Sequence, residues 1–193
     1  AGRDLKLFSR VWRGLDMPDV WKGCRVRSAV VKDRYRRLST DEVRRLVAAV
    51  RSGHEPGKVS GHWTKESVQP KPDVADLIAM GYYTGLRRGD CARLKAGHIE
   101  DGGEFLRVVP EKTAGRKGAS LLIPLIPEAR ELAARLAAAA DPDGGTLFPR
   151  LDGASLGKCL RLAFARAKVT DNESGHASFH SLRATFISAM DEA

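Results

Sequence analysis

The sequence predicts an α+β fold, a mostly helical domain with a small antiparallel β-sheet. Apolar residues recur with helical spacing in most segments of the chain. Between about residues 104 and 124 the pattern changes, and two short apolar stretches flank a polar loop as in a β-hairpin. Hydrophobic residues make up 42% and charged residues 30% of the 193 residues, a balance that allows a sizeable core and argues against intrinsic disorder.

The N-terminal part of the chain differs from the rest. Residues 5–12 resemble the end of an amphipathic helix, and glycine and proline residues then interrupt the periodicity. The segment 25–38 is interpreted as a basic linker rather than a packed element. Its basic residues are Arg25, Arg27, Lys32, Arg34, Arg36 and Arg37. We therefore expect residues 1–24 to be the remnant of a helical domain and residues 39–193 to form the main domain.

Three helices are expected before the hairpin. Ser39 and Glu42 form an S-x-x-E capping box, and the apolar residues that follow repeat with helical spacing. A polar loop then precedes a second helix. A proline marks the start of this helix and a glycine marks its end. The expected limits are Gly53 for the end of the first helix, Pro72 and Gly85 for the second, and residues 89–95 for the third.

Two strands and three more helices complete the predicted order. The strands, at 104–109 and 120–124, enclose the polar loop 112–118. The helices are expected over residues 127–140 and 154–168 and from His180 onward, with loops at 141–153 and 170–178. In the last helix, Leu182, Phe186 and Ala189 are predicted to take the core face.

The net charge points to a polyanionic partner. The chain has 33 Lys and Arg against 24 Asp and Glu, a formal charge of +9, and an isoelectric point near 9.8. Nucleic acid is the most common partner of such a surface, with solubility alone as the alternative. Aromatic residues, at 6%, are too few for a platform that stacks single-stranded bases.

Several other classes of protein are not indicated. The three cysteines, Cys24, Cys91 and Cys159, are far apart and predict neither a disulfide framework nor a Cys-x-x-Cys metal site. No apolar run approaches the roughly 18 residues of a membrane span, and no secretory signal is recognised. No phosphate-binding loop of the ATPase type is present. We expect a cytoplasmic protein without membrane contact, metal or other cofactor.

Four polar residues stand where they could meet at one site: Arg87, Lys112, His180 and Arg183. Each alone would more often be an ordinary surface or capping residue. Together they form an anion-stabilising set, because guanidinium groups match phosphate oxygens in a bidentate way. A phosphoryl transfer would need such donors to hold the charge of its transition state. His176 and His180 could give half of a zinc site, but no third ligand is evident.

Four short motifs resemble those of the tyrosine recombinase (phage integrase) family. They are Arg37-Leu38-Ser39-Thr40-Asp41-Glu42, Tyr83-Thr84-Gly85-Leu86-Arg87-Arg88-Gly89-Asp90 continuing to Leu94, Lys112-Thr113 ahead of Ile123-Pro124-Leu125, and His180-Ser181-Leu182-Arg183 followed by Thr185-Phe186. Their order is that of the family's catalytic domain, and the match covers about residues 36–190. The resemblance implies the fold of DNA breaking-rejoining enzymes and a site-specific recombinase or integrase.

The resemblance also implies a role for each matching residue. Arg87 and Arg183 would bind the non-bridging oxygens of the scissile phosphate, and Lys112 would protonate the leaving 5′-oxygen. His180 would assist proton transfer or donate a hydrogen bond to the phosphate. Asp90, where the family usually has Glu, would brace Arg87. Besides the basic residues of segment 25–38, we expect DNA contacts from Arg116 and Lys117.

The family's nucleophilic tyrosine has no counterpart after Arg183. The three tyrosines, Tyr35, Tyr82 and Tyr83, precede or adjoin the first motif. We therefore expect a catalytic domain truncated before its nucleophile and inactive alone, with residues 1–24 as the remnant of a helical core-binding domain. The intact protein would form a 3′-phosphotyrosyl intermediate without ATP or metal, as a tetramer on double-stranded DNA. The alternatives are a non-catalytic DNA-binding protein with the same fold, or a basic domain with accidental matches.

Overall fold

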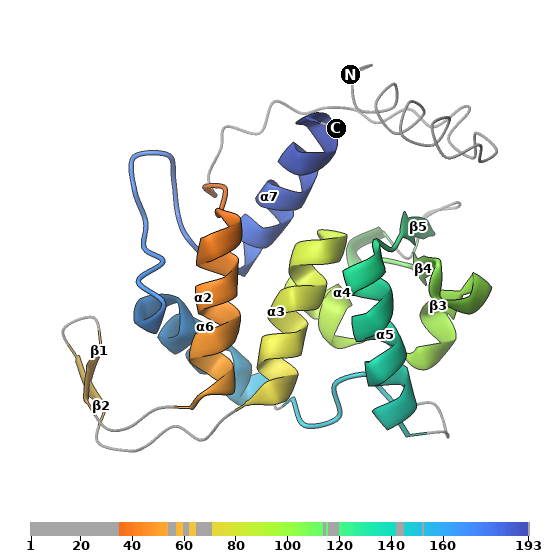
Figure 1. Ribbon diagram of the computed structural model, residues 1–193, viewed down its shortest axis with the longest axis horizontal. Coiled ribbons are helices and arrows are strands. Elements are labelled where there is room, and N and C mark those ends of the chain that lie inside the picture. The colour runs from red at the N-terminus through yellow and green to blue at the C-terminus, as the bar shows by residue number, and fades with distance from the viewer. Residues whose placement is uncertain are drawn as a thin grey trace.

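The computed structural model describes residues 35–53, 57–59, 62–64, 71–113, 115, 120–141, 145–151 and 153–192. These residues form a mostly helical domain with a three-stranded antiparallel sheet on one side (Figure 1), which confirms the predicted α+β class. The helices are α2 (Thr40–Arg51), α3 (Pro72–Thr84), α4 (Arg88–Ala92), α5 (Pro127–Ala139), α6 (Gly153–Arg166) and α7 (Phe179–Glu192). The predicted helical remnant over residues 1–24, the basic residues before Tyr35, and Arg116 and Lys117 lie outside the described residues.

Helix α3 is the centre of the domain. It lies between α2 and α5 (Figure 1) and also contacts α4, α6 and α7. Its side chains from Val74 to Ile78 are all buried, as expected for a helix covered on every side. One of them is a carboxylate, Asp76, which accepts hydrogen bonds from Arg51 of α2 at 2.9 Å and from Arg135 of α5 at 2.9 and 3.0 Å. This buried carboxylate therefore ties three helices together.

The start of α2 is the predicted capping box. The Ser39 hydroxyl accepts a hydrogen bond from the backbone N–H of Glu42 at 3.2 Å, and the Glu42 carboxylate accepts one from the backbone N–H of Ser39 at 2.9 Å. The predicted apolar face is buried at Val43, Leu46 and Val50. Two otherwise unpaired N–H groups are satisfied, so the helix has a defined first turn.

Two glycines, Gly81 of α3 and Gly85 at its C-terminal cap, allow α7 to approach closely. Gly85 ends α3 with a left-handed backbone, φ +61°, as predicted for a C-terminal cap. A Cβ atom built at Gly85 would lie 2.5 Å from Cδ1 of Phe186, and one at Gly81 would lie 2.5 Å from Cζ of Phe179. Both rings belong to α7. The absence of side chains at these positions is what lets α7 lie directly on the C-terminal half of α3.

The main sheet contains the predicted hairpin and one further strand. Its order is β3 (Ile99–Glu100), β4 (Phe105–Val108) and β5 (Leu121–Pro124), with Arg107 opposite Leu122. A second, two-stranded sheet pairs β1 (Gly57–Val59) with β2 (His62–Thr64) inside the segment predicted to be a polar loop. Strands of two or three residues are too short to show an alternating pattern, so β1, β2 and β3 could not be predicted from periodicity.

Residues 35–38 are packed on the domain, although the sequence was interpreted as a basic linker up to residue 38. Arg36 is only 6% exposed. Its guanidinium donates to the Glu42 carboxylate at 2.8 and 3.1 Å and to the carbonyl oxygen of Thr170 at 2.7 Å. This differs from the expected DNA contact. A buried guanidinium needs its donors satisfied, and here they hold two segments of the domain together.

Candidate functional site

The turn between α3 and α4 presents two arginines. Gly85 reverses the chain, Leu86 is buried, and Arg87 occupies the cap position before α4 with an extended backbone. Arg87 is half-buried and Arg88 is exposed. Neither guanidinium has a hydrogen bond or ion pair with any residue of the described ranges. The residues on both sides of the turn, Leu86 and Asp90, are buried in the domain. Their packing fixes the backbone that carries Arg87 and Arg88.

Helix α7 brings His180 and Arg183 to the same place. Phe179 and Leu182 are buried beneath the helix, which leaves His180 exposed and Arg183 half-buried on the other face. Nη1 of Arg183 donates a hydrogen bond to the carbonyl oxygen of Gly85 at 2.6 Å. This bond joins α7 to the turn that carries Arg87. Ala189, predicted on the core face, is exposed instead. The buried apolar side chains of α7, Phe179 and Leu182, lie in its first turn, and Ala189 lies beyond them.

Lys112 reaches the site from the hairpin. It lies in a short 3-10 turn, η3 (Glu111–Thr113), between β4 and β5, and its side chain is exposed. The backbone N–H of Glu111 donates a hydrogen bond to Oδ1 of Asp90 at 3.0 Å. That oxygen also accepts a bond from Nη2 of Arg93 at 3.0 Å. The turn next to Lys112 is therefore anchored to α4, close to Arg87 in the chain.

Asp90 has a different set of partners from the one that the resemblance implied. It was expected to brace Arg87, but its hydrogen bonds within the described residues go to Arg93 and to the backbone of Glu111. The carboxyl is 7% exposed. Arg93 also pairs with the Glu111 side chain at 2.8 Å. Asp90 and Arg93 of the α4 region therefore both contact Glu111, the residue before Lys112. Within the described residues, the hydrogen bonds of Asp90 thus hold the turn beside Lys112 and do not reach Arg87.

The electrostatics of His180 place it within reach of the other positive charges. The pKa of His180 is lowered from its ordinary value, first by burial and then by the positive charges of Arg87, Arg88, Arg183 and Lys112. The pKa of Arg183 is lowered as well, by burial and by Arg87, while Asp90 opposes the shift. All four predicted site residues thus meet in one positive region. Arg88 also acts on His180 and was not among the predicted site residues, although it directly follows Arg87 in the first motif.

Such a cluster of like charges needs an anion. Asp90 is a carboxylate that acts electrostatically on Arg183, and its Oδ1 already accepts hydrogen bonds from Arg93 and from the backbone of Glu111. Two arginines can hold the two non-bridging oxygens of a phosphodiester, each through parallel N–H donors. His180 is held neutral at neutral pH by its lowered pKa, so it can donate or accept a proton there. The arrangement can bind a phosphate group and move a proton beside it.

No three His, Cys, Asp or Glu side chains of the described residues come together in a way that could hold a metal ion. His176, the other half of the zinc alternative, pairs through Nδ1 with Asp171 at 2.8 Å. In the part of the chain that the structure describes, no helix is both long and apolar enough to cross a membrane.

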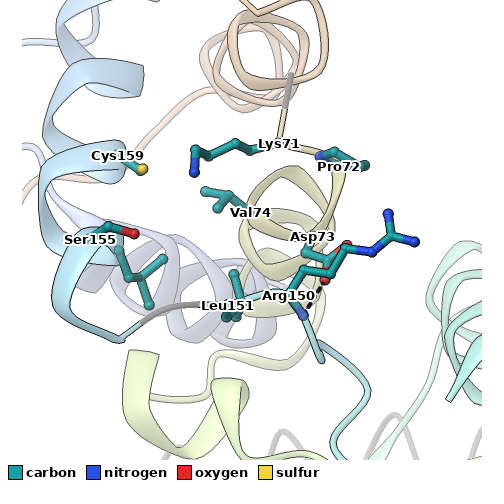
Figure 2. Close-up of a pocket in the computed structure, with 9 residues that line it drawn as sticks. Lys71, Pro72, Asp73, Val74, Arg150, Leu151, Ser155 and Cys159 are labelled. Carbon is teal, nitrogen blue, oxygen red and sulfur yellow. Dashed lines mark hydrogen bonds between the residues drawn. The ribbon is translucent and has the colours of Figure 1, made fainter. Parts of the chain in front are cut away.

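A hollow of about 190 Å³ lies at the opposite end of α3 (Figure 2). It is lined by the first residues of α3 and by α6, and includes Lys71, Ser155 and Cys159. The backbone N–H of Arg150 donates to Oδ2 of Asp73 at its rim, at 3.0 Å. The thirteen residues of α3 separate this hollow from Gly85 by about 20 Å, at 1.5 Å per residue, so it is not part of the phosphate site.

Comparisons with known proteins bear on the family and the fold of this chain. A family model described as "Phage integrase family" matches residues 36–193. A search of curated proteins found no match. Among solved structures, the crystal structure of XerA recombinase has a TM-score of 0.52 at 19% identity, covering 94% of this chain and 57% of that one.

Two structures of lambda integrase are similar to the same degree. A dimer bound to a COC′ core site has a TM-score of 0.50 at 23% identity, covering 93% of this chain and 58% of that one. A tetramer bound to a Holliday junction has a TM-score of 0.51 at 23% identity, covering 93% and 47%. These matches bear on the fold. The chain spans about half to three fifths of the length of the proteins that it matches.

Proposed function

Because this chain belongs to the phage integrase family, we propose that it carries the phosphate-binding site of a site-specific tyrosine recombinase. Its substrate in this proposal is double-stranded DNA, and the reaction is cleavage and rejoining of one strand at a time. The net charge of +9 favours such a polyanion. The lambda integrase structures are a dimer on a core site and a tetramer on a Holliday junction, and the second is the basis for proposing that this protein assembles on DNA as a tetramer.

One observation carries the proposal: Arg87 is unpaired beside Arg183, within the electrostatic reach of His180. A buried arginine with a structural role has its donors satisfied by protein groups, as Arg36 has. Arg87 has none among the described residues. Free guanidinium donors next to a second arginine match a phosphodiester with two charged oxygens.

In the proposed reaction, the two arginines hold the phosphate and stabilise its transition state. Arg87 and Arg183 donate hydrogen bonds to the non-bridging oxygens, where negative charge grows as a fifth ligand joins phosphorus. The bond of Arg183 to the Gly85 carbonyl uses one of its donors and leaves the others for the phosphate. Since this bond also fixes the turn before Arg87, both arginines are positioned before DNA arrives.

In this proposal, Lys112 and His180 take part in proton transfer. A tyrosine hydroxyl attacks phosphorus and the bond to the 5′-oxygen breaks, leaving a 3′-phosphotyrosyl ester. Lys112 donates its proton to that 5′-oxygen. The attacking tyrosine gives up its hydroxyl proton, which passes to His180 where the imidazole assists proton transfer, or to water where His180 only donates a hydrogen bond to the phosphate. The reverse attack by a 5′-hydroxyl rejoins the strand. The energy of the broken bond is kept in the ester, so this scheme uses no ATP.

We propose that the nucleophilic tyrosine is supplied from outside these 193 residues. Tyr82 and Tyr83 pack against each other on α3, with ring centroids 5.3 Å apart. The pKa of Tyr83 is raised above its ordinary value, chiefly by burial, which disfavours the phenolate that attacks phosphorus. Tyr35 lies with its ring stacked on the imidazole of His180.

The experiment that tests the function is trapping on a nicked DNA substrate that loses its 5′-hydroxyl strand after cleavage. We expect the intact protein to give a covalent protein–DNA band on a denaturing gel, and the Arg87→Ala variant to give none. The 193-residue chain should bind the same DNA without a covalent band. If the intact protein binds DNA but never forms the adduct, the alternative holds, a non-catalytic DNA-binding protein with the recombinase fold.

A further inference from the structure

The ring of Tyr35 lies over the imidazole of His180. The ring centroids are 5.0 Å apart and the ring planes differ by 20°, which is a stacked arrangement. Tyr35 is the first described residue of the chain, and His180 is near the start of α7. A residue at the entry to the domain thus touches a residue of the phosphate site.

The backbone around Tyr35 fixes its position. Tyr35 forms a parallel β-bridge with His176, and the N–H of Arg36 donates to the His176 carbonyl at 3.0 Å. The buried Arg36 guanidinium holds the Thr170 carbonyl at 2.7 Å, at the other end of the loop that leads to α7. The N–H of Leu38 donates to the Thr185 hydroxyl at 2.8 Å. The segment is therefore pinned both to this loop and to α7.

His180 lacks the kind of support that His176 has. The imidazole of His176 is held by the Asp171 carboxylate at 2.8 Å. The imidazole of His180 has no hydrogen bond to any residue in the described part of the chain, although its backbone N–H is bonded to the Ser178 hydroxyl. Its orientation must then come from packing, and the ring of Tyr35 is the flat surface against which it packs.

Orientation matters for this imidazole in particular. Both of its ring nitrogens are free for a ligand, and its neighbours Arg87, Arg88, Lys112 and Arg183 are all cations. These cations, with burial, keep the ring neutral near neutral pH, so it can donate one hydrogen bond and accept another. A ring free to rotate would present the correct nitrogen to the phosphate for only part of the time.

We propose that Tyr35 is a positioning residue, whose aromatic ring sets the orientation of the His180 imidazole toward the scissile phosphate. The catalytic importance of this orientation rests on the proposed function, whereas the contact between Tyr35 and His180 does not. Tyr35 lies within the segment 25–38 that the sequence predicts to be a basic linker, directly after Arg34, so the residue that touches His180 belongs to a segment with expected DNA contacts.

The contact is tested by NMR of the histidine ring protons in the 193-residue chain, with Tyr35→Phe and Tyr35→Ala variants. In Tyr35→Ala we expect the His180 ring protons to move downfield, as the ring current of the tyrosine is lost, and the pKa of His180 to rise toward its ordinary value. Tyr35→Phe should keep both. His98, on the 3-10 turn η1 (Ala96–His98), serves as the internal control and should titrate alike in all three proteins. If Tyr35→Ala does not fold, Tyr35→Leu, which is apolar but not aromatic, takes its place.

The functional consequence is tested in the intact protein by single-turnover cleavage of the nicked substrate. Tyr35→Ala should lower the rate constant at saturating DNA by roughly 10- to 100-fold, the range expected when a catalytic group is misplaced, and change the Kd by less than about twofold. Tyr35→Phe should restore the rate. Unchanged His180 signals in Tyr35→Ala, or an equal rate loss in Tyr35→Phe, would overturn the proposal. If the intact protein never cleaves DNA, the proposed function fails, and the NMR result still decides whether Tyr35 orients His180.

Discussion

Arg183 donates a hydrogen bond from Nη1 to the carbonyl oxygen of Gly85, at 2.6 Å, and thereby joins α7 to the turn between α3 and α4. Gly85 is also the residue whose missing side chain admits Phe186 of α7. One glycine therefore serves both the packing of the two helices and the placement of Arg183. Arg87, two residues further along the chain, takes its position from the same turn.

The first prediction concerns Gly85→Ala. The backbone φ of +61° disfavours any side chain, and the new Cβ would lie 2.5 Å from Cδ1 of Phe186. We expect a loss in the free energy of unfolding of about 2–4 kcal/mol from strain and overpacking together. DNA binding should also weaken, because a shift of α7 away from the new Cβ moves Arg183 from the Gly85 carbonyl. Chemical denaturation and fluorescence anisotropy measure the two effects.

Gly97→Ala is the matched control for this substitution. Gly97 has no heavy atom within 4 Å of a built Cβ and no positive φ. Its replacement should leave stability unchanged or raise it slightly, by about 0.4–1 kcal/mol. Equal stability of the Gly85→Ala and Gly97→Ala proteins would contradict the packing of α7 on Gly85.

The second prediction is the salt dependence of DNA binding. Each phosphate neutralised by a cation releases counterions, so the logarithm of the binding constant falls with the logarithm of salt concentration. Arg87→Ala removes one proposed phosphate contact, and the slope should become shallower by about 0.9. Arg44→Ala removes the same charge from an exposed i,i+3 pair with Asp41 on α2, and should leave the slope near that of the parent chain. A slope that is flat for all three proteins would count against DNA as the ligand.

The third prediction concerns the buried ion pair of Arg36 and Glu42. The side chains are 7% and 18% exposed, and the hydrogen bond from Arg36 is the largest of the effects that lower the pKa of Glu42. Glu42→Gln leaves the Arg36 charge without its partner and should cost about 3–5 kcal/mol of the free energy of unfolding at pH 7. Asp41→Asn, next to it in an exposed pair, should cost about 1 kcal/mol or less.

The pH dependence of that cost follows from the direction of the pKa shift. The pKa of Glu42 is lower in the folded protein, so its contribution is complete above its ordinary pKa and is lost as the pH falls through the lowered value. The difference in stability between the parent chain and Glu42→Gln should therefore shrink below about pH 4. Denaturation at several pH values measures this. A difference that stays constant down to pH 3 would contradict the assigned pair.

The features that the sequence predicted well are those that neighbouring residues determine. The capping box of Ser39 and Glu42 and the glycine that ends α3 depend on contacts within one turn, and both are confirmed. The longer helices are found close to their predicted limits, for example α5, predicted at 127–140. Local pattern and capping chemistry suffice for these elements.

Contacts between distant segments could not be predicted in the same way. Arg36 stands in a run of basic residues typical of a linker, and its partner Glu42 already has a role in the capping box. Nothing in the sequence shows that one carboxylate serves both. The bond of Asp90 to the Glu111 N–H and the stack of Tyr35 on His180 likewise join residues far apart in the chain. The motifs indicate the candidate site residues, whereas the contacts that hold these residues in place can be seen only in the structure.

The last prediction separates the role of Lys112 from that of the arginines, and it concerns the intact protein. If Lys112 is the general acid, it protonates a 5′-alkoxide, which is a poor leaving group. General acid catalysis contributes on the order of 10²–10⁴ in rate, so Lys112→Ala should lose about that much in strand cleavage. Replacing the bridging 5′-oxygen with sulfur gives a thiolate leaving group, which is stable near neutral pH without a proton. Cleavage of the sulfur substrate should then be nearly insensitive to Lys112→Ala.

The arginines and a matched lysine complete this experiment. Arg87→Ala and Arg183→Ala should stay defective on the sulfur substrate, because the charge on the non-bridging oxygens still needs their donors. Lys158→Ala removes an exposed lysine from α6 and should cleave both substrates at the parent rate. The competing explanation is that Lys112 only contacts the DNA backbone, in which case its loss weakens binding and sulfur restores nothing. Equal defects of Lys112→Ala on the oxygen and sulfur substrates would therefore remove this lysine from proton transfer and leave Asp90 and Arg93 supporting a DNA contact instead.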